Sequence, residues 1–232
     1  MADEDSHRVG APTPLEVLQV MASQQVMVSP ALRHIEMYTM RGLLSLYWHE
    51  PVDAARDVAV VMGGGAMGGV LGPGESLFHV LGEELCARGI PTLRISWRKP
   101  NDLDSCCVDM AAAVQLAVGS GAERVVTMGH SFGGAVAVRV AVGLPDMVAG
   151  VATFATQSAG CEVAGGLQGR PLLMFHGDRD SILPVEASEV VRAIAGTGDL
   201  RVMPGDDHLL ARSHQVMLEG TLEWLDQVFG PA

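Results

Sequence analysis

The stretch VVTMGHSFGG, residues 125–134, places a serine between an apolar strand and a helix built from small residues. The apolar run 125–128 is typical of a buried strand, and the run 135–142 is typical of a helix that packs closely on a sheet. Between them, residues 129–133 match the pattern G-x-S-x-G. A sharp strand-to-helix turn holds the serine in a strained backbone with its hydroxyl clear of the sheet, and flanking side chains would collide. Ser131 is therefore a candidate nucleophile, and a glycine-rich structural turn is the alternative.

Strands and helices alternate around this stretch. Residues 34–39 and 42–48 alternate like two antiparallel strands, with Arg41-Gly42 near the turn. From residue 58 onward the alternation predicts a mostly parallel sheet with helices on both faces. Further strands are predicted at 58–62, 92–97, 125–128, 147–155, 171–175 and 200–203, and helices at 76–88, 103–118, 132–142, 185–194 and 213–228. The sequence thus predicts a single α/β domain over 34–232, preceded by a loose N-terminal arm over 1–33 with one possible helix at 15–26.

Composition limits the classes of function. The 232 residues are 48% hydrophobic and 18% charged, which is typical of a globular core, and the net charge of -12 argues against a nucleic-acid partner. The acidic amino terminus lacks the basic and apolar regions of a secretory signal, and no apolar stretch is long enough for a membrane span. Four cysteines without CxxC spacing indicate free thiols in a reducing compartment. We expect a cytoplasmic protein, and the sequence leaves its oligomeric state open.

In its strand–turn–helix context, the G-x-S-x-G match resembles the nucleophile elbow of the α/β-hydrolase superfamily, and the resemblance covers residues 58–228. Members of this family place the nucleophile, the acid and the histidine in that order along the chain. HGDRDSILP, residues 176–184, looks like the acid turn H-G-x-x-D-x-x-x-P and selects Asp180, with Asp178 as the alternative. PGDDH, residues 204–208, offers His208 as the base, with His214 as the alternative.

The resemblance implies a mechanism and an oxyanion hole. His208 would take the proton of Ser131, and Asp180 would stabilise the imidazolium. The predicted oxyanion donors are the backbone N–H of Phe132 and that of Gly64, with Gly65 second, because MGGG at 62–65 stands where many members have H-G-G-G. The histidine of that motif is replaced here by Met62, which cannot make its polar contacts. No cofactor and no metal are expected, and His130 and His176 are expected to be structural.

Two other features have competing interpretations. Gly63, Gly65 and Gly68 also match the dinucleotide fingerprint G-x-G-x-x-G, but the loop continues through 69–74 where the fingerprint requires a helix, and no acidic residue ends the next strand. Residues 97–100, WRKP, end a predicted strand. We expect a packed tryptophan followed by solvated charges there, and a substrate contact is the alternative.

The interval 156–170 decides how open the site is. Family members with a lid insert it between the two strands that flank this interval, and these residues leave no room for one. The chain therefore resembles the compact esterases and dienelactone-hydrolase-like members, and the expected partner is a small-molecule ester with a short acyl group. A thioesterase or other acyl hydrolase and a catalytically silent ligand-binding protein remain alternatives.

Overall fold

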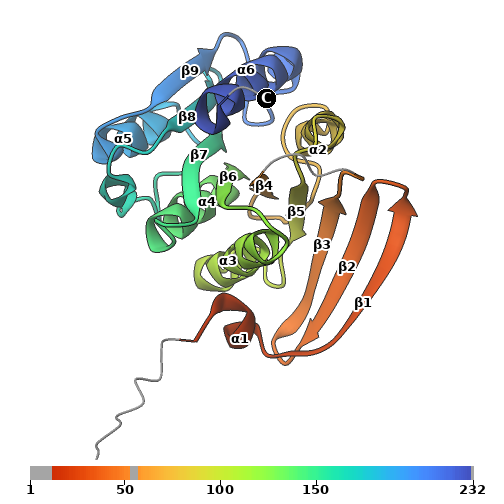
Figure 1. Ribbon diagram of the computed structural model, residues 1–232. Helices are drawn as coiled ribbons and strands as arrows, with labels where there is room; N and C mark the ends of the chain where they lie inside the picture. Colours follow the sequence, from red (N-terminus) through yellow and green to blue (C-terminus); the bar gives the residue numbers. More distant parts are fainter. Residues whose placement is uncertain (1–11, 53–56, 231–232) are drawn as a thin grey trace, which may run out of the picture.

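The computed structural model of this protein describes residues 12–52 and 57–230 (Figure 1). Nine strands form one sheet in the order β1-β2-β3-β5-β4-β6-β7-β8-β9. The strands are β1 (Val20–Ser29), β2 (Leu32–Thr39), β3 (Gly42–His49), β4 (Val58–Gly63), β5 (Thr92–Ser96), β6 (Arg124–His130), β7 (Val148–Phe154), β8 (Leu172–Gly177) and β9 (Asp199–Met203). The α-helices are α1 (Pro14–Leu18), α2 (Leu77–Ala87), α3 (Leu103–Gly119), α4 (Phe132–Gly143), α5 (Glu186–Ala195) and α6 (His214–Phe229), with 3-10 turns η1 (Ala164–Leu167) and η2 (Ala211–Ser213).

The direction of the strands confirms the predicted fold class. Strands β5, β4, β6, β7, β8 and β9 run parallel to one another, whereas β1, β2 and β3 form an antiparallel edge that joins β5. The chain passes from β4 to β5 on one side and then crosses to β6 on the other. The strand order therefore reverses at β4, and in open α/β sheets the crevice at the carboxyl ends of the strands beside such a reversal is where ligands bind.

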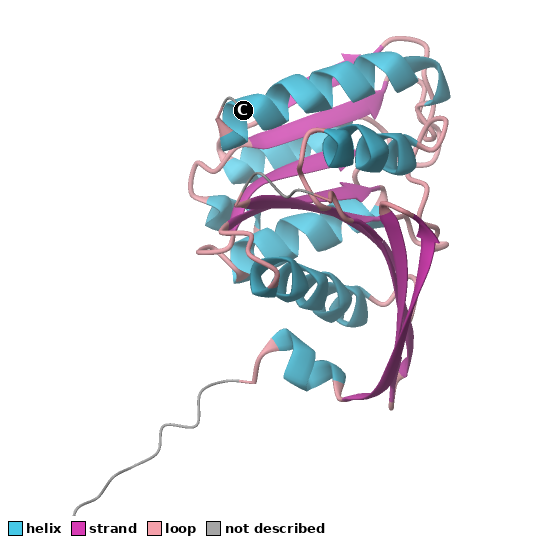
Figure 2. Ribbon diagram, turned by 45° about the vertical axis from the view of Figure 1, so that its right-hand side comes forward, coloured by secondary structure: helices cyan, strands magenta, loops and turns pink. Residues whose placement is uncertain are grey.

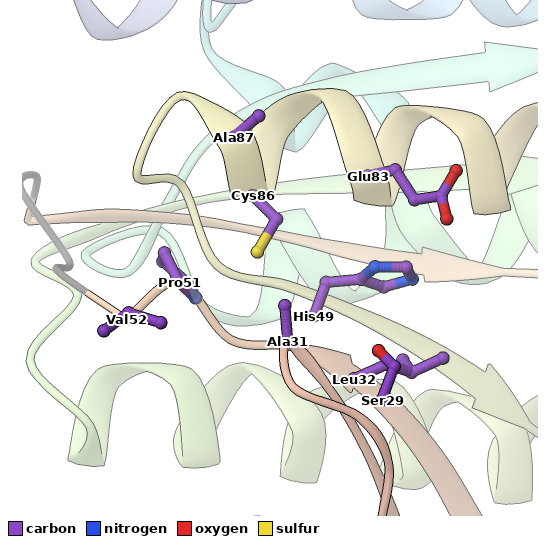
Figure 3. A pocket seen from close by; sticks show the side chains of 9 residues that line it. All are labelled: Ser29, Ala31, Leu32, His49, Pro51, Val52, Glu83, Cys86 and Ala87. Atoms are coloured by element: carbon purple, nitrogen blue, oxygen red, sulfur yellow. The ribbon is translucent and has the colours of Figure 1, made fainter.

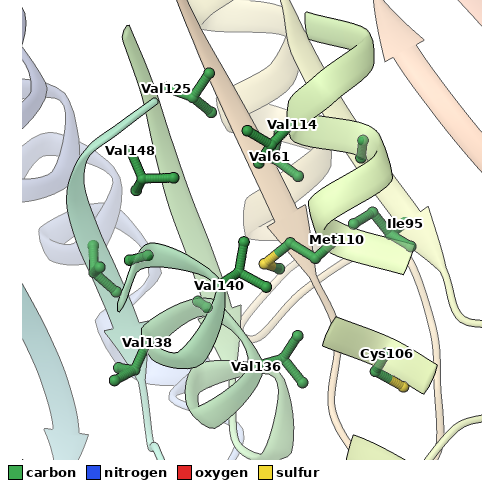
Figure 4. Close-up of a cluster of buried hydrophobic side chains, with 14 of the residues drawn as sticks. Val61, Ile95, Cys106, Met110, Val114, Val125, Val136, Val138, Val140 and Val148 are labelled. Carbon is green, nitrogen blue, oxygen red and sulfur yellow. The ribbon is translucent and has the colours of Figure 1, made fainter. Parts of the chain in front are cut away.

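Helices cover both faces of the parallel part of the sheet, as Figure 2 shows. All six residues of β4 are buried, and they alternate between two separate cores. Val61 faces the core made with α3 and α4, where it lies among Met110, Val114 and Val136 (Figure 4). Val60 faces the other core, made with α2 and α6. A strand buried on both faces explains why 58–62 is a continuous apolar run with no polar alternation.

The predicted arm, residues 1–33, differs from expectation where the structure describes it. The helix predicted at 15–26 is wrong beyond Leu18, because Gln19 adopts a left-handed conformation (φ 51) that ends α1. Residues 20–29 instead form β1, which pairs antiparallel with β2. Valine and methionine recur along this segment, and β-branched residues favour an extended backbone over a helix. Residues 20–33 thus contribute to the sheet, and residues 1–11 lie outside the described part of the chain.

The short helix α1 is fixed to the body of the protein. Thr13 and Glu16 form a reciprocal capping box at its start, and Leu18 at its end is buried in the core shared with α3. The backbone N–H of Leu15 also donates to Gln115 Oε1 on α3, at 2.9 Å. Within residues 12–52 and 57–230, none of the helices combines the length and the apolarity that crossing a membrane would require.

Candidate active site

Ser131 sits at the turn between β6, which ends at His130, and α4, which begins at Phe132. Its backbone has φ 54 and ψ -118, a region that residues with a side chain rarely adopt. Neighbouring glycines make this turn possible. A Cβ on Gly129 would collide with the carbonyl of Gly133, and a Cβ on Gly133 would collide with the carbonyls of the β4–α2 loop. The strained turn predicted from G-x-S-x-G is therefore present, and Ser131 is 9% exposed.

Three polar side chains meet at the carboxyl ends of β6, β8 and β9. His208 Nε2 lies 3.0 Å from Ser131 Oγ, and His208 Nδ1 lies 2.6 Å from Asp180 Oδ2. Because an ionised carboxylate can only accept, Nδ1 carries the ring proton and Nε2 presents its lone pair to the serine hydroxyl. The structure thus brings together the three residues that the sequence singled out, in a continuous hydrogen-bonded chain.

Asp180 is held as an anion by its surroundings. Its side chain is fully buried, and Oδ1 accepts hydrogen bonds from the backbone N–H groups of Ile182 (2.8 Å) and Leu183 (2.9 Å). Burial alone would raise the pKa of Asp180, but the hydrogen bonds from Leu183, His208 and Ile182 outweigh it and hold the pKa below its usual value. The carboxylate therefore stays charged beside the imidazole.

The two alternative residues lie in other contacts. The carboxylate of Asp178 accepts from the backbone N–H of Gly205 at 2.6 Å, which ties the acid turn to the loop that carries His208. His214 is the first residue of α6, and its ring lies beside Gly74 in the loop before α2. Neither contact joins the chain of Ser131, His208 and Asp180.

His130 contacts the backbone of His208, and His176 contacts the turn that carries Asp180. His130 Nε2 donates to the backbone carbonyl of His208 at 3.0 Å, and burial lowers the pKa of His130 to about 4, so its ring is neutral. His176 Nε2 lies 2.8 Å from the carbonyl of Leu183 and 3.2 Å from Asp180 Oδ2. Both residues thus make the structural contacts that the sequence led us to expect.

Asp206 is a supporting residue that the sequence reasoning did not identify. It is only 2% exposed, and its carboxylate accepts from the backbone N–H groups of Ser213 (2.9 Å) and Asp207 (3.1 Å). These bonds fix the loop that positions His208. Two adjacent aspartates before the histidine were the available signal, since acidic residues often order a loop by accepting backbone N–H bonds.

The glycine loop after β4 lies directly beside the nucleophile. An ideal Cβ on Gly65 would lie 3.6 Å from Ser131 Cβ, whereas one on Gly64 would collide with the carbonyl of Gly69. The carbonyl of Gly64 accepts from Trp97 Nε1 at 3.1 Å. Of the two candidate oxyanion donors, Gly65 thus lies next to Ser131, whereas Gly64 is tied to Trp97. The next helix, α2, begins only at Leu77, as expected for a loop unlike a dinucleotide site.

The structure confirms the expected packing of Trp97 but not the expected exposure of the Arg98 charge. Trp97 is packed, at 4% exposure, as expected. The solvated charge expected at Arg98 is wrong, because its guanidinium is buried and forms an ion pair with Asp109 on α3. Asp109 Oδ2 also accepts from the backbone N–H of Arg98 at 3.0 Å. The partner lies eleven residues along the chain on a helix, and its buried position could not be read from the local WRKP pattern.

A cavity of about 320 Å³ adjoins the nucleophile. Its wall is mostly backbone, because glycines supply most of the lining, and Val70 and Leu71 supply its apolar side chains. The lining residues are Gly64, Gly65, Gly68, Gly69, Val70, Leu71, Gly72 and His130. Gly65 and His130, which line the cavity, are both neighbours of Ser131, so the cavity lies close to the serine.

A second cavity, of about 370 Å³, lies at the opposite end of the sheet (Figure 3). Side chains of His49, Glu83 and Cys86 line it, and His49 pairs with Thr92 at the start of β5. Burial, followed by the charge of Arg94, lowers the pKa of His49 to about 4. The parallel strands begin at the end of the sheet where this cavity lies, and Ser131 lies at their carboxyl end. The second cavity is therefore remote from Ser131, His208 and Asp180.

No family model matches the sequence, and no curated protein matches it either. Solved structures do match the fold. Est1E from Butyrivibrio proteoclasticus superposes with a TM-score of 0.70 at 18% identity, covering 84% of this chain and 98% of that one. An alpha-beta serine hydrolase homologue from Coxiella burnetii gives 0.68 at 18% identity, with coverage of 87% and 100%. XC6422 from Xanthomonas campestris, described as an α/β serine hydrolase without a lid, gives 0.69 at 16% identity, with coverage of 89% and 99%.

The connection between β7 and β8 shows whether this fold carries a lid. Residues 155–171, all of them described, contain only the short 3-10 turn η1 in the place where lids are inserted. The strand order, the strained serine turn and these structural matches agree with one another. The chain therefore has the α/β-hydrolase fold, in the lidless form.

Proposed function

We propose that this protein is a serine hydrolase that cleaves carboxylic esters of small or short-acyl substrates through an acyl-enzyme. One observation carries the proposal. Ser131 Oγ, the two ring nitrogens of His208 and Asp180 Oδ2 are linked by contacts of 3.0 and 2.6 Å. A nucleophile hydrogen-bonded to a base, which a third group orients, is the arrangement that activates a serine for acyl transfer.

In the proposed reaction His208 acts first as base and then as acid. Its Nε2 takes the Ser131 proton while Oγ attacks the ester carbonyl, and the imidazolium then protonates the leaving alcohol as the acyl-enzyme forms. Water, deprotonated by the same nitrogen, hydrolyses the acyl-enzyme and regenerates Ser131. Asp180 stays ionised throughout and stabilises the imidazolium, which agrees with its lowered pKa.

Backbone N–H groups would stabilise the oxyanion that forms in each step. We propose Phe132, whose N–H is one of the unpaired donors of the first turn of α4, together with the glycine loop. Between Gly64 and Gly65, the position of Gly65 next to Ser131 favours Gly65. Each such donor typically contributes about 3 kcal/mol to stabilisation of the transition state.

The walls of the cavity near Ser131 support a small substrate. The cavity of about 320 Å³ has only Val70 and Leu71 as apolar side chains, and the described connection between β7 and β8 adds no lid to it. Each methylene buried against an apolar wall contributes about 0.8 kcal/mol, so a long acyl chain would gain little here. A cold-adapted esterase from an Arctic intertidal metagenomic library, which has the same fold (TM-score 0.70, 15% identity), supports an ester as the substrate.

Two measurements test the proposal. A fluorophosphonate probe should label the native protein at Ser131 and should not label Ser131→Ala. A series of p-nitrophenyl esters, run beside acyl-CoA thioesters, should give the highest kcat/KM for the short oxygen esters. Absence of labelling would favour a silent ligand-binding protein, and a preference for the thioesters would reassign the substrate class.

A further inference from the structure

β1 is the outermost strand of the sheet (Figure 1). It is exposed along its whole length. All ten of its residues, VMASQQVMVS, are exposed, and none is charged or a proline. Val26, Met27 and Val28 are each more than half exposed. β1 pairs on one side with β2, so the backbone N–H and C=O groups on its other side have no strand beside them among the described residues.

The opposite edge of the same sheet has the protection that β1 lacks. β9 has five residues, against ten in β1, and it carries an ion pair between Asp199 and Arg201. Short length and charged side chains are the usual features that stop an edge strand from pairing with another chain. The two edges therefore differ in the property that governs intermolecular pairing.

We propose that β1 is a dimerisation edge, which pairs antiparallel with β1 of a second copy of this chain and continues the sheet from one copy into the other. Register shifts separate Val20 from Ala22 and Met27 from Ser29, which leaves a regular central segment over 22–27. A twofold axis perpendicular to the sheet through that segment makes the interface isologous and closed, so association stops at two copies.

The uncharged side chains of β1 suit a second copy as its occupant. The chain carries a net charge of -12, and copies that met through most surfaces would place carboxylates opposite one another. The uncharged β1 avoids this repulsion, and it offers a charged partner no ion to pair with. Its centre also suits self-pairing, since Gln24 or Gln25 would face its own equivalent, and an amide both donates and accepts hydrogen bonds.

The side chains define which substitutions test the pairing. Ala22, Gln24 and Val26 lie on one face of β1, opposite Tyr38, Glu36 and His34 of β2, and each is exposed. A lysine at positions 22 and 26 would bring four ammonium groups together at the centre of the dimer, and like charges across adjacent strands are destabilising. The backbone pairing of β1 with β2 would remain, because these side chains point away from the sheet plane.

Sedimentation velocity over about 1 to 100 µM protein tests the proposal. Wild type should approach twice the monomer mass of 24.4 kDa as concentration rises, whereas Ala22→Lys/Val26→Lys should stay at the monomer mass with an unchanged circular dichroism spectrum. Val216→Lys on α6 is the matched control, since Val216 is 55% exposed and Val26 is 57% exposed. This control should dimerise like wild type.

Hydrogen exchange gives a second reading that does not depend on the substitutions. Backbone amides within 22–27 should become more protected as wild-type concentration rises, and the protection should be lost in the double-lysine variant. The proposal is overturned if wild type stays a monomer across the range, if the variant still dimerises, or if wild type forms larger assemblies. Activity toward p-nitrophenyl acetate serves only as a folding check, because β1 is separated from the Ser131 end of β6 by four strands in the sheet.

Discussion

Asp180 Oδ2 lies 2.6 Å from His208 Nδ1, while Asp180 Oδ1 is occupied by two backbone N–H groups. Each oxygen of the carboxylate therefore has a separate role, one in fixing the acid turn and the other in orienting the base. The carboxylate of Asp178, two residues earlier, instead accepts a hydrogen bond from the backbone N–H of Gly205. Asp180 therefore contacts the base His208, whereas Asp178 only connects two loops.

Asp180→Asn should lower kcat/KM for a short ester by about 10⁴-fold, because an amide favours the wrong ring tautomer of His208. Asp178→Asn is the matched control, and it should cost less than about tenfold, since an asparagine oxygen can still accept from Gly205. Steady-state kinetics of the two variants at one pH settle the assignment. Equal losses, or a larger loss at Asp178, would show that the acid is assigned incorrectly.

Ser131→Ala and Ser131→Gly should both reduce turnover below about a thousandth of wild type, but they should differ in stability. Glycine tolerates φ 54 and ψ -118, so Ser131→Gly should gain up to about 1 kcal/mol in the free energy of unfolding, while Ser131→Ala keeps the strain. Urea unfolding of the three proteins measures this. If the glycine variant is less stable than the alanine variant, the turn is not a reservoir of strain.

The buried imidazole of His130 should make the fold sensitive to mild acid. Its pKa is about 4 in the folded protein, below the ordinary 6.5. Between pH 6.5 and pH 4, therefore, the imidazole is protonated in the unfolded chain but neutral in the folded protein. Stability should consequently fall as pH drops from 6.5 toward 4, with a contribution of up to about 1 kcal/mol per pH unit. His130→Asn should show a shallower fall in urea midpoints over this range, and an unchanged slope would contradict the assignment.

Trp97→Phe should lower kcat with little change in KM, because it removes the donor to the carbonyl of Gly64 and loosens the loop beside Ser131. We expect a loss of about tenfold, smaller than the loss of a whole oxyanion donor. Trp224→Phe is the control for the loss of an indole, since Trp224 lies on α6 and is buried in the core. A change confined to KM would mean that Trp97 acts on substrate binding instead.

The absence of a lid between β7 and β8 gives a kinetic expectation. Hydrolysis of soluble short-chain esters should follow ordinary saturation, without a rise in rate when the substrate exceeds its solubility, because no segment there has to open. Initial rates measured across the solubility limit of p-nitrophenyl butyrate provide the test. A sharp rise at the limit would show that some other segment covers the site.

The parallel core was predictable because its signals are local. The run 58–62, the turn at 129–133 and the loops at 176–184 and 204–208 each carry their own periodicity or motif, and the structure places them within a residue or two of the predicted bounds. Ser131, Asp180 and His208 could likewise be picked by their order, because parallel strands bring their carboxyl ends to one edge.

The remaining features depend on contacts that a motif does not contain. β1 was missed because its apolar residues fit both a helix and a strand until β2 is placed beside them. Arg98 and Asp109 pair only once α3 packs on the sheet. Gly64 and Gly65 are chemically identical, so only the position of Ser131 distinguishes them.

The close approach of Gly133 to the carbonyls of Gly63 and Gly64 limits how this scaffold can be redesigned. A side chain at Gly133 would collide with these carbonyls, and one at Gly64 would collide with the carbonyl of Gly69, so neither glycine tolerates substitution on its own. Gly72 is likewise closed off, by the ring of Phe78. Among the residues that line the cavity, Val70 and Leu71 are the ones that already carry apolar side chains. A mutant library aimed at new substrates would best be concentrated on these two positions, where acceptance of larger acids or alcohols could change while the machinery around Ser131 stays intact.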